Sequence, residues 1–318
     1  MGRYIIKRLL GSVGVLFVTS ILIFTLIRLS PGDPVDIMFG PSQGVESREM
    51  VSEETRNKIR EELGLNKPLA VQYFLWLRRV VHLDFGYSFR SRQPVAKEIL
   101  RRLPATVFLA IFAFSIAAVI TTIFGILSAV KVDSVIDHTV RLGTVLFSAV
   151  PSFWLSLIFL FIFAVKLRWI SVTGAVNLRQ MILPAMTLAL VISPQKIRVL
   201  RASMLSELNR PYIVFGKAKG LTEKRLIFMH AFRNAILPVV TLLGMSFAGL
   251  LGGSVIIETI FSYPGIGKYM IDSIYARDYP VIQAYVILAT FFVVIINLIV
   301  DMSYTFLDPR VRLGKERD

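Results

Sequence analysis

The chain of 318 residues contains no cysteine and only three histidines, His82, His138 and His230. The missing thiols exclude disulfides, thiolate metal sites and cysteine nucleophiles. Acidic residues are also scarce, since 36 Lys and Arg face 21 Asp and Glu and leave a net charge of +15. No RNA- or DNA-binding motif accompanies this charge. The sequence therefore predicts no nucleic-acid partner.

A complete phosphate-binding loop is missing as well. Residues 263–268 contain the string GIGK, but Ser262 stands where the loop needs its first glycine and Tyr269 where it needs Ser or Thr. No histidine lies inside an apolar run, so a metal relay across a membrane is not expected. We expect neither a cofactor nor a metal on this chain, and no catalytic residues.

Hydrophobic residues are what the sequence has in excess: they make up 55% of it, with a mean hydropathy of +0.66. This content is high for a soluble domain and typical of a membrane protein. Six apolar runs are candidates for membrane-spanning helices. They cover residues 9–29, 106–130, 142–165, 181–195, 235–257 and 281–307. The expected fold class is an all-α polytopic membrane protein.

The basic residues predict the orientation. They gather at residues 1–8, 131–141, 196–234 and 308–318. Loops that retain Lys and Arg stay on the cytoplasmic side, so both termini are predicted to be cytoplasmic. The segments 30–105, 166–180 and 258–280 then lie outside.

The outer segment 30–105 is predicted to be helical. Ser52 is a candidate cap for a polar helix over 53–63, which Gly64 ends. Pro94 opens a further short helix that reaches Arg102.

Between these two helices, Pro68 opens an amphipathic helix for which we expect a face of Phe74, Trp76 and Leu77. Two interpretations of that face stay open. It either lies on the membrane or belongs to a small external cap that meets a binding protein.

The basic segment 196–234 carries the most informative pattern. Pro211 is suited to the first turn of a short helix, and Gly220 is suited to end it in a left-handed conformation. Thr222 is placed to cap a second helix, with Glu223 near the positive end of its dipole. Such an elbow is either a rigid docking element for a cytosolic partner or a solvated basic loop that only fixes topology.

Two strings in this region resemble a known family. Tyr212-Ile-Val-Phe-Gly-Lys-Ala-Lys-Gly-Leu221, followed by Arg233-Asn-Ala-Ile-Leu-Pro238, resembles the cytoplasmic "EAA" loop of ABC-importer permeases. The peptide/nickel branch is the most similar, with a pattern near Y-x-R-T-A-R-A-K-G-L. The chain departs from it at Val214, Phe215 and Gly216.

The resemblance implies the type I importer permease fold, with an ABC transmembrane domain over about residues 98–304. It implies half of a translocation pore in a bacterial or archaeal inner membrane. The expected partners are a second homologous permease, two ATP-binding subunits that carry the ATP, an extracytoplasmic solute-binding protein and membrane lipid. The residues expected to dock the ATPase are Tyr212, Gly216, Lys217, Ala218, Lys219, Gly220, Leu221 and Arg233.

A second group of residues is expected to be structural or to gate the pore: Pro238, Pro264, Gly265, Gly267 and Asp301. Asp301 is an acid inside the sixth apolar run, and such an acid is a candidate functional residue. A self-sufficient, ion-coupled secondary transporter is the alternative function, although no second acid lies at mid-depth. The cargo stays open between di- or oligopeptides and nickel.

Overall fold

A computed structural model describes residues 2–38, 52–62, 64–169 and 178–307. Every regular element among them is a helix, and one isolated bridge joins Tyr87 to Pro94. The chain divides into two compact units, which are described separately below. Unit 1 comprises residues 1–105 and 264–294, and unit 2 comprises 106–263 and 295–318. Helices α5 and α15 each contribute residues to both units.

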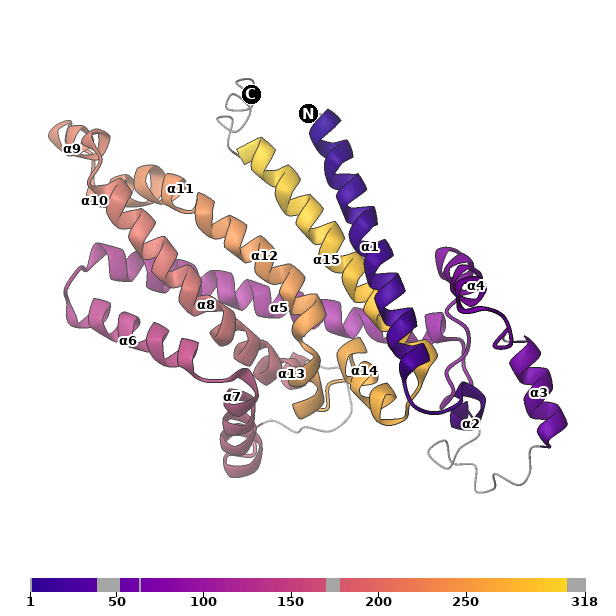
Figure 1. Ribbon diagram of the computed structural model, residues 1–318. Coiled ribbons are helices and arrows are strands. Elements are labelled where there is room, and N and C mark those ends of the chain that lie inside the picture. The colour runs from indigo at the N-terminus through magenta and orange to yellow at the C-terminus, as the bar shows by residue number, and fades with distance from the viewer. Residues whose placement is uncertain (1, 39–51, 63, 170–177, 308–318) are drawn as a thin grey trace. The chain divides into compact units, whose positions relative to one another are not determined.

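Unit 1 holds the N-terminal helices. These are α1 (Gly2–Leu29), α2 (Pro34–Met38), α3 (Glu53–Glu62), α4 (Leu69–Val81) and the start of α5 (Val95–Val130). They are joined by α14 (Ile266–Tyr275) and the first half of α15 (Tyr279–Leu307). Figure 1 shows α15 running beside α1, and the hydroxyls of Ser30 and Tyr279 are hydrogen-bonded at 3.0 Å.

The core of unit 1 corrects the face expected for α4. The buried side chains of this helix are Tyr73, Trp76 and Val80, which pack on Ile23 and Phe24 of α1, whereas the Phe74 side chain is 65% exposed. Tyr73, Trp76 and Val80 are spaced i, i+3 and i+7 and share one face, whereas Phe74 is two residues from Trp76 and therefore lies on the opposite side of the helix. Contact with α1 selects the stripe that carries Tyr73, whose hydroxyl pairs with the Ser20 hydroxyl at 2.8 Å.

The buried carboxylate of Asp278 holds the turn over residues 84–94. It accepts the Ser88 hydroxyl at 2.5 Å and the backbone N–H of Phe89 at 3.0 Å. Gly86, at φ +76°, bends this turn and donates its N–H to Asp84. Asp278 is 1% exposed, so two segments that are distant in sequence share one buried polar contact.

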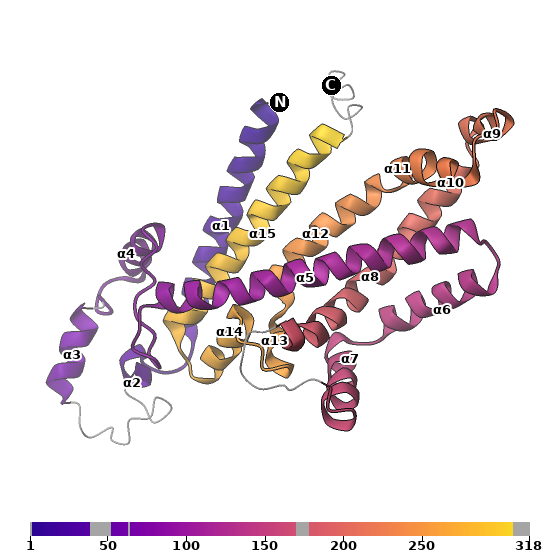
Figure 2. The ribbon, with the colours of Figure 1, turned by 180° about the vertical axis from the view of Figure 1, so that it is seen from behind.

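Unit 2 holds the remaining helices. These are α6 (Val135–Ala149), α7 (Ser152–Phe159), the π-helical η3 (Leu160–Lys166), α8 (Leu178–Leu208), α9 (Pro211–Ala218), α10 (Glu223–Arg225), the π-helical η4 (Leu226–Ala231), α11 (Phe232–Ala235), α12 (Leu237–Gly253) and α13 (Val255–Ile260). Figure 2 shows α5, α6 and α8 from behind, with α6 alongside α8.

Within the residues that the structure describes, four helices are long and apolar enough to cross a membrane: Arg8–Leu29, Val95–Val130, Arg179–Leu208 and Tyr279–Val300. Two bent pairs bring the number to as many as six. One pair comprises α6 and α7 with η3, which meet at 105°, and the other comprises Glu223–Ala235 and Leu237–Gly252, which meet at 52°. Length and composition thus support four to six spans.

Two expected boundaries differ from the structure. The run 142–165 was expected to be one span, but the chain bends at Pro151, because proline lacks the N–H that would continue the helix. The short helix expected from Pro94 to Arg102 and the span expected from 106 are one continuous helix, α5, with Pro104 inside it. The run 181–195 is part of α8, which continues through Pro194 to Leu208.

Candidate functional site

The basic segment folds as a helical elbow at the end of α8. Pro211 occupies the first turn of α9, and its fixed φ and missing N–H suit that position. Thr222 is the N-cap residue of α10, but its side chain makes no capping hydrogen bond. From there α10, η4 and α11 lead into α12, where Pro238 lies in the first turn.

The end of α9 is a Schellman motif, which confirms the expected left-handed Gly220. Gly220 has φ +80°, and its N–H donates to the Lys217 carbonyl at 2.9 Å. The N–H of Leu221 donates to the Gly216 carbonyl at 3.1 Å. These two bonds satisfy carbonyls that the helix end would leave unpaired, and they fix the angle at which the chain leaves α9.

Gly216 lets α9 approach its neighbours closely. A β-carbon built at this position would lie 2.7 Å from Leu226 Cδ2 and 3.3 Å from Leu221 Cδ1. Both distances are shorter than ordinary contacts, so a larger residue would require these side chains to move. The glycine that departs from the branch pattern therefore has a local packing reason.

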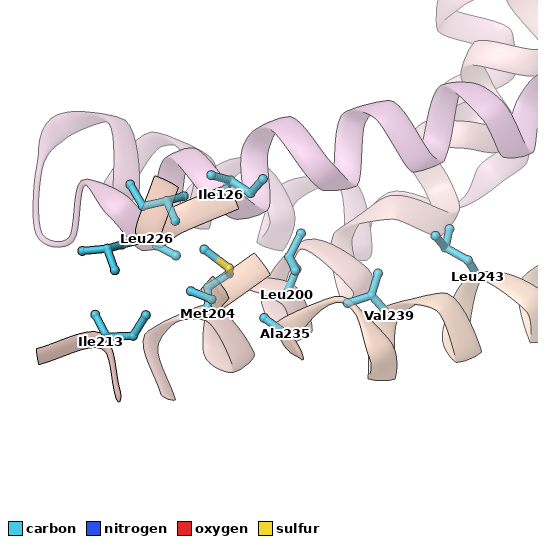
Figure 3. Packing of buried hydrophobic residues seen from close by; sticks show 11 residues of the cluster. Ile126, Leu200, Met204, Ile213, Leu226, Ala235, Val239 and Leu243 are labelled. Atoms are coloured by element: carbon cyan, nitrogen blue, oxygen red, sulfur yellow. The ribbon is translucent and has the colours of Figure 1, made fainter. Parts of the chain in front are cut away.

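A single buried side chain anchors α9 to the membrane helices. Ile213 is 1% exposed and belongs to a cluster that includes residues of α5, α8, η4, α11 and α12 (Figure 3). The labelled members are Ile126, Leu200, Met204, Ile213, Leu226, Ala235, Val239 and Leu243. Because interiors are close-packed, a displacement of α9 is transmitted to the helices that share this cluster.

Tyr212 connects the two arms of the elbow. Its hydroxyl donates to Glu207 Oε2 at 2.5 Å and accepts from Asn234 Nδ2 at 3.3 Å. Burial and the bond to Glu207 raise the pKa of the Tyr212 phenol, so it stays protonated and can keep donating. This residue, expected to dock a partner, makes contacts within the chain.

The outward side of α9 is apolar and cationic. Val214 and Phe215 are 62% and 61% exposed, and Lys217, Lys219 and Arg233 are exposed as well. The Lys219 ammonium lies 4.6 Å from the centre of the Phe215 ring. The structure therefore brings the expected docking residues together in one elbow. Ala218, Gly220 and Leu221 form its turn, and the cations lie on its surface.

Sequence reasoning missed a buried ion pair that supports the elbow from the side. Asp137 is fully buried and accepts Arg201 Nε at 2.8 Å and Arg201 Nη2 at 2.7 Å. It also accepts from the Ser128 hydroxyl and from the N–H of Asp133. The pair joins the turn between α5 and α6 to α8. The available signal was an acid three residues after the helix-capping Ser134, which is the spacing of an N-terminal capping pattern.

The other expected structural residues are not part of the elbow, which belongs to unit 2. Pro264, Gly265 and Gly267 belong to unit 1, where Gly265 is the N-cap residue of α14 and Gly267 is buried. Asp301 lies in α15, but its side chain is outside the described residues. Among the residues that are described, no group of three or more His, Asp or Glu is placed to hold a metal ion.

Small residues of α12 permit close helix packing, and Gly244 packs within the chain. A β-carbon at Gly244 would lie 2.7 Å from Val300 Cγ2 of α15, so the glycine permits close contact of two helices of unit 2. A β-carbon built at Gly249 would have no neighbouring atom within 4 Å.

These features define a class, that of a multi-pass helical membrane protein with a basic, partly apolar elbow at the end of one long helix. Comparison with known proteins gives the family. Residues 121–313 match the family described as "Binding-protein-dependent transport system inner membrane component", and residues 1–110 match the N-terminal model of such membrane components. The chain belongs to this family, the permeases of ABC importers, and is a multi-pass protein of the inner membrane.

Similar proteins cover almost the whole chain. The oligopeptide transport system permease protein AppB of Bacillus subtilis is 38% identical over 98% of this chain and 99% of its own length. The glutathione transport system permease protein GsiC of Escherichia coli K12 is 36% identical over 98% of this chain and 99% of its own length. The family is a transport component rather than an enzyme, and it works with a substrate-binding protein and ABC partners.

Proposed function

We propose that this chain forms half of the translocation pore of a peptide importer, and that residues 196–234 receive the motion of its ATP-hydrolysing subunits. One observation carries the proposal. Helix α9 exposes Val214 and Phe215, while Ile213 of the same helix lies in the core shared with α5, α8 and α12. A partner that moves α9 thereby moves the pore helices.

The proposed assembly contains a second homologous permease, two ATP-binding subunits and an extracytoplasmic binding protein. The cations around α9 suit a partner groove with an acidic rim, since complementary charges steer and orient association. The docking residues are those named above, from Tyr212 to Leu221 together with Arg233.

Peptide is the proposed cargo. The relatives described above are named as oligopeptide and glutathione permeases, and a third, from Sinorhizobium fredii, is named as a probable peptide permease. In cells that lack this gene, uptake of radiolabelled di- and oligopeptides should fall while uptake of ⁶³Ni²⁺ stays unchanged. A loss of nickel uptake with normal peptide uptake would reverse the cargo assignment.

Replacing Gly220 with valine should lower peptide uptake several-fold while ATP hydrolysis continues. A branched residue in a left-handed conformation costs roughly 1–2 kcal/mol, and the open space around Gly220 makes backbone strain the only cost. Gly220→Asn is the matched control, because asparagine tolerates this conformation. Uptake and ATP hydrolysis are measured together in proteoliposomes, and a valine variant with normal uptake per ATP would count against the elbow.

The proposed topology places both termini in the cytoplasm and residues 30–105 outside. Ser52, exposed at the start of α3, is a suitable reporter in a cysteine-free chain. A Ser52→Cys variant should react with a membrane-impermeant maleimide added to intact spheroplasts. Reaction only after the cytoplasmic face is opened would require the opposite orientation.

A further inference from the structure

Helix α4 is apolar on more than one face. Tyr73, Trp76 and Val80 are buried against unit 1, yet Val71, Phe74 and Leu75 on the outer side are 42%, 65% and 40% exposed. The preceding helix α3, EETRNKIREE, carries almost no apolar residues. A helix that packs one face against protein and exposes the other face to water is expected to be polar on that second face. Helix α3 has such a polar surface, and α4 does not.

The depth of α4 along α1 indicates what covers the outer face. The Tyr73 hydroxyl bonds to Ser20, and its ring lies 6.4 Å from the Phe17 ring. Ser20 precedes the end of α1 by about nine residues, or roughly 13 Å at the rise of an α-helix. Because the hydrocarbon core is ~30 Å thick, this contact lies inside the bilayer if the span Arg8–Leu29 crosses it.

Contacts with a second span give the same depth independently. The buried cluster of Tyr73, Trp76 and Val80 packs against Ile282, Val286 and Ile287, which lie in the span Tyr279–Val300 of α15. Helix α4 therefore rests on two membrane helices below their outer ends.

An apolar cavity of about 440 Å³ lies between α4 and these two helices. Its lining residues include Phe17 of α1, Val81 at the end of α4, Leu83 just after α4, and Leu288 of α15. Val81 and Leu83 are 72% and 67% exposed. An apolar space at this depth matches the chemistry of a lipid acyl chain.

The cations of α4 share its outer side with the apolar residues, since Arg78 and Arg79 are exposed next to Leu75. Together with Leu75, they line a depression of about 510 Å³ whose other lining residues include Glu61, Lys67, His82 and Asp84. Long cationic side chains reach polar surroundings while their stems stay apolar. An outer side that combines Phe and Leu with Arg is typical of helices that lie in a membrane interface.

We propose that α4 lies within the lipid leaflet that meets the Leu29 end of α1, with Phe74 and Leu75 against lipid and an acyl chain in the cavity beneath Val81. The proposal goes beyond the proposed function and depends only on α1 and α15 crossing the bilayer. It assigns α4 to the membrane rather than to a cap in water.

Spin labels test the proposal in the full chain, assembled with its partner subunits in lipid nanodiscs. A label at Phe74→Cys should collide readily with oxygen and several-fold less with the water-soluble nickel complex NiEDDA than a label at Asn57→Cys does. Asn57 is the matched control because it is exposed on the polar helix α3. Leu75→Cys repeats the measurement should Phe74→Cys fail to assemble.

Two results would overturn the proposal. Equal NiEDDA collision at positions 74 and 57 would place α4 in water, and exclusion of both oxygen and NiEDDA would place a protein partner over it. The cavity is tested separately with a phospholipid that carries a diazirine on its acyl chain. Cross-links to residues 81–85 or 287–291 are expected, and cross-links confined to other segments would remove the acyl chain from the cavity.

Discussion

Replacing Ile213 with alanine should lower ATP-driven peptide uptake about tenfold or more. Truncating a buried isoleucine costs about 2–5 kcal/mol, and the Ile213 side chain is 1% exposed. A loss of 1.4 kcal/mol already corresponds to a factor of ten. Because Ile213 anchors α9 to the cluster, ATP hydrolysis should continue while its motion no longer reaches α8 and α12.

Leu146→Ala serves as the control for this prediction. Leu146 lies in α6, is 56% exposed and takes no part in the cluster around Ile213, so its truncation should leave uptake within about twofold. Uptake and ATP hydrolysis are measured in the same proteoliposomes. If Ile213→Ala and the control gave the same uptake, the anchor would have no role in coupling.

The second large effect is expected at the buried ion pair. Arg201→Ala alone should destabilise the chain by about 3–5 kcal/mol, since it leaves the fully buried Asp137 carboxylate without its main partner. Asp137→Ala should cost less, because the Arg201 side chain is 21% exposed and can still reach water. The double substitution should cost less than the sum, with an interaction energy of about 1–3 kcal/mol. Thermal unfolding followed by tryptophan fluorescence gives all three values.

Arg198→Ala on the same helix is the control for the ion pair. The Arg198 guanidinium donates to the Ser148 hydroxyl at 3.1 Å and the Thr144 carbonyl at 3.4 Å, both neutral groups, so its loss should cost about 1 kcal/mol or less. Additive effects at positions 137 and 201 would show that the pair does not hold α8 to the turn before α6.

The elbow could be predicted because its signals are local. Proline at the start of a helix and glycine at its end act through their own backbone, and Pro211 and Gly220 occupy the expected positions. The family resemblance rested on residues 212–221 and 233–238, which include Gly220.

Features set by distant contacts could not be predicted. The sequence does not show which side of α4 faces α1, because both sides carry large apolar residues, Tyr73 and Trp76 on one and Phe74 and Leu75 on the other. The pairing of Asp137 with Arg201 joins positions far apart in the chain. Pro151 indicates that the helix can be interrupted there, but the sequence does not give the angle of 105° between the two helices that it separates.

The most direct test of the central claim is reconstitution with subunits omitted one at a time. This chain should show no peptide uptake by itself under a proton or sodium gradient, because it has no complete phosphate-binding loop and its energy must come from another subunit. Uptake should appear only when the second permease, the ATP-binding subunits, the binding protein and ATP are all present. Gradient-driven uptake by the purified chain alone would contradict the account and identify a secondary transporter.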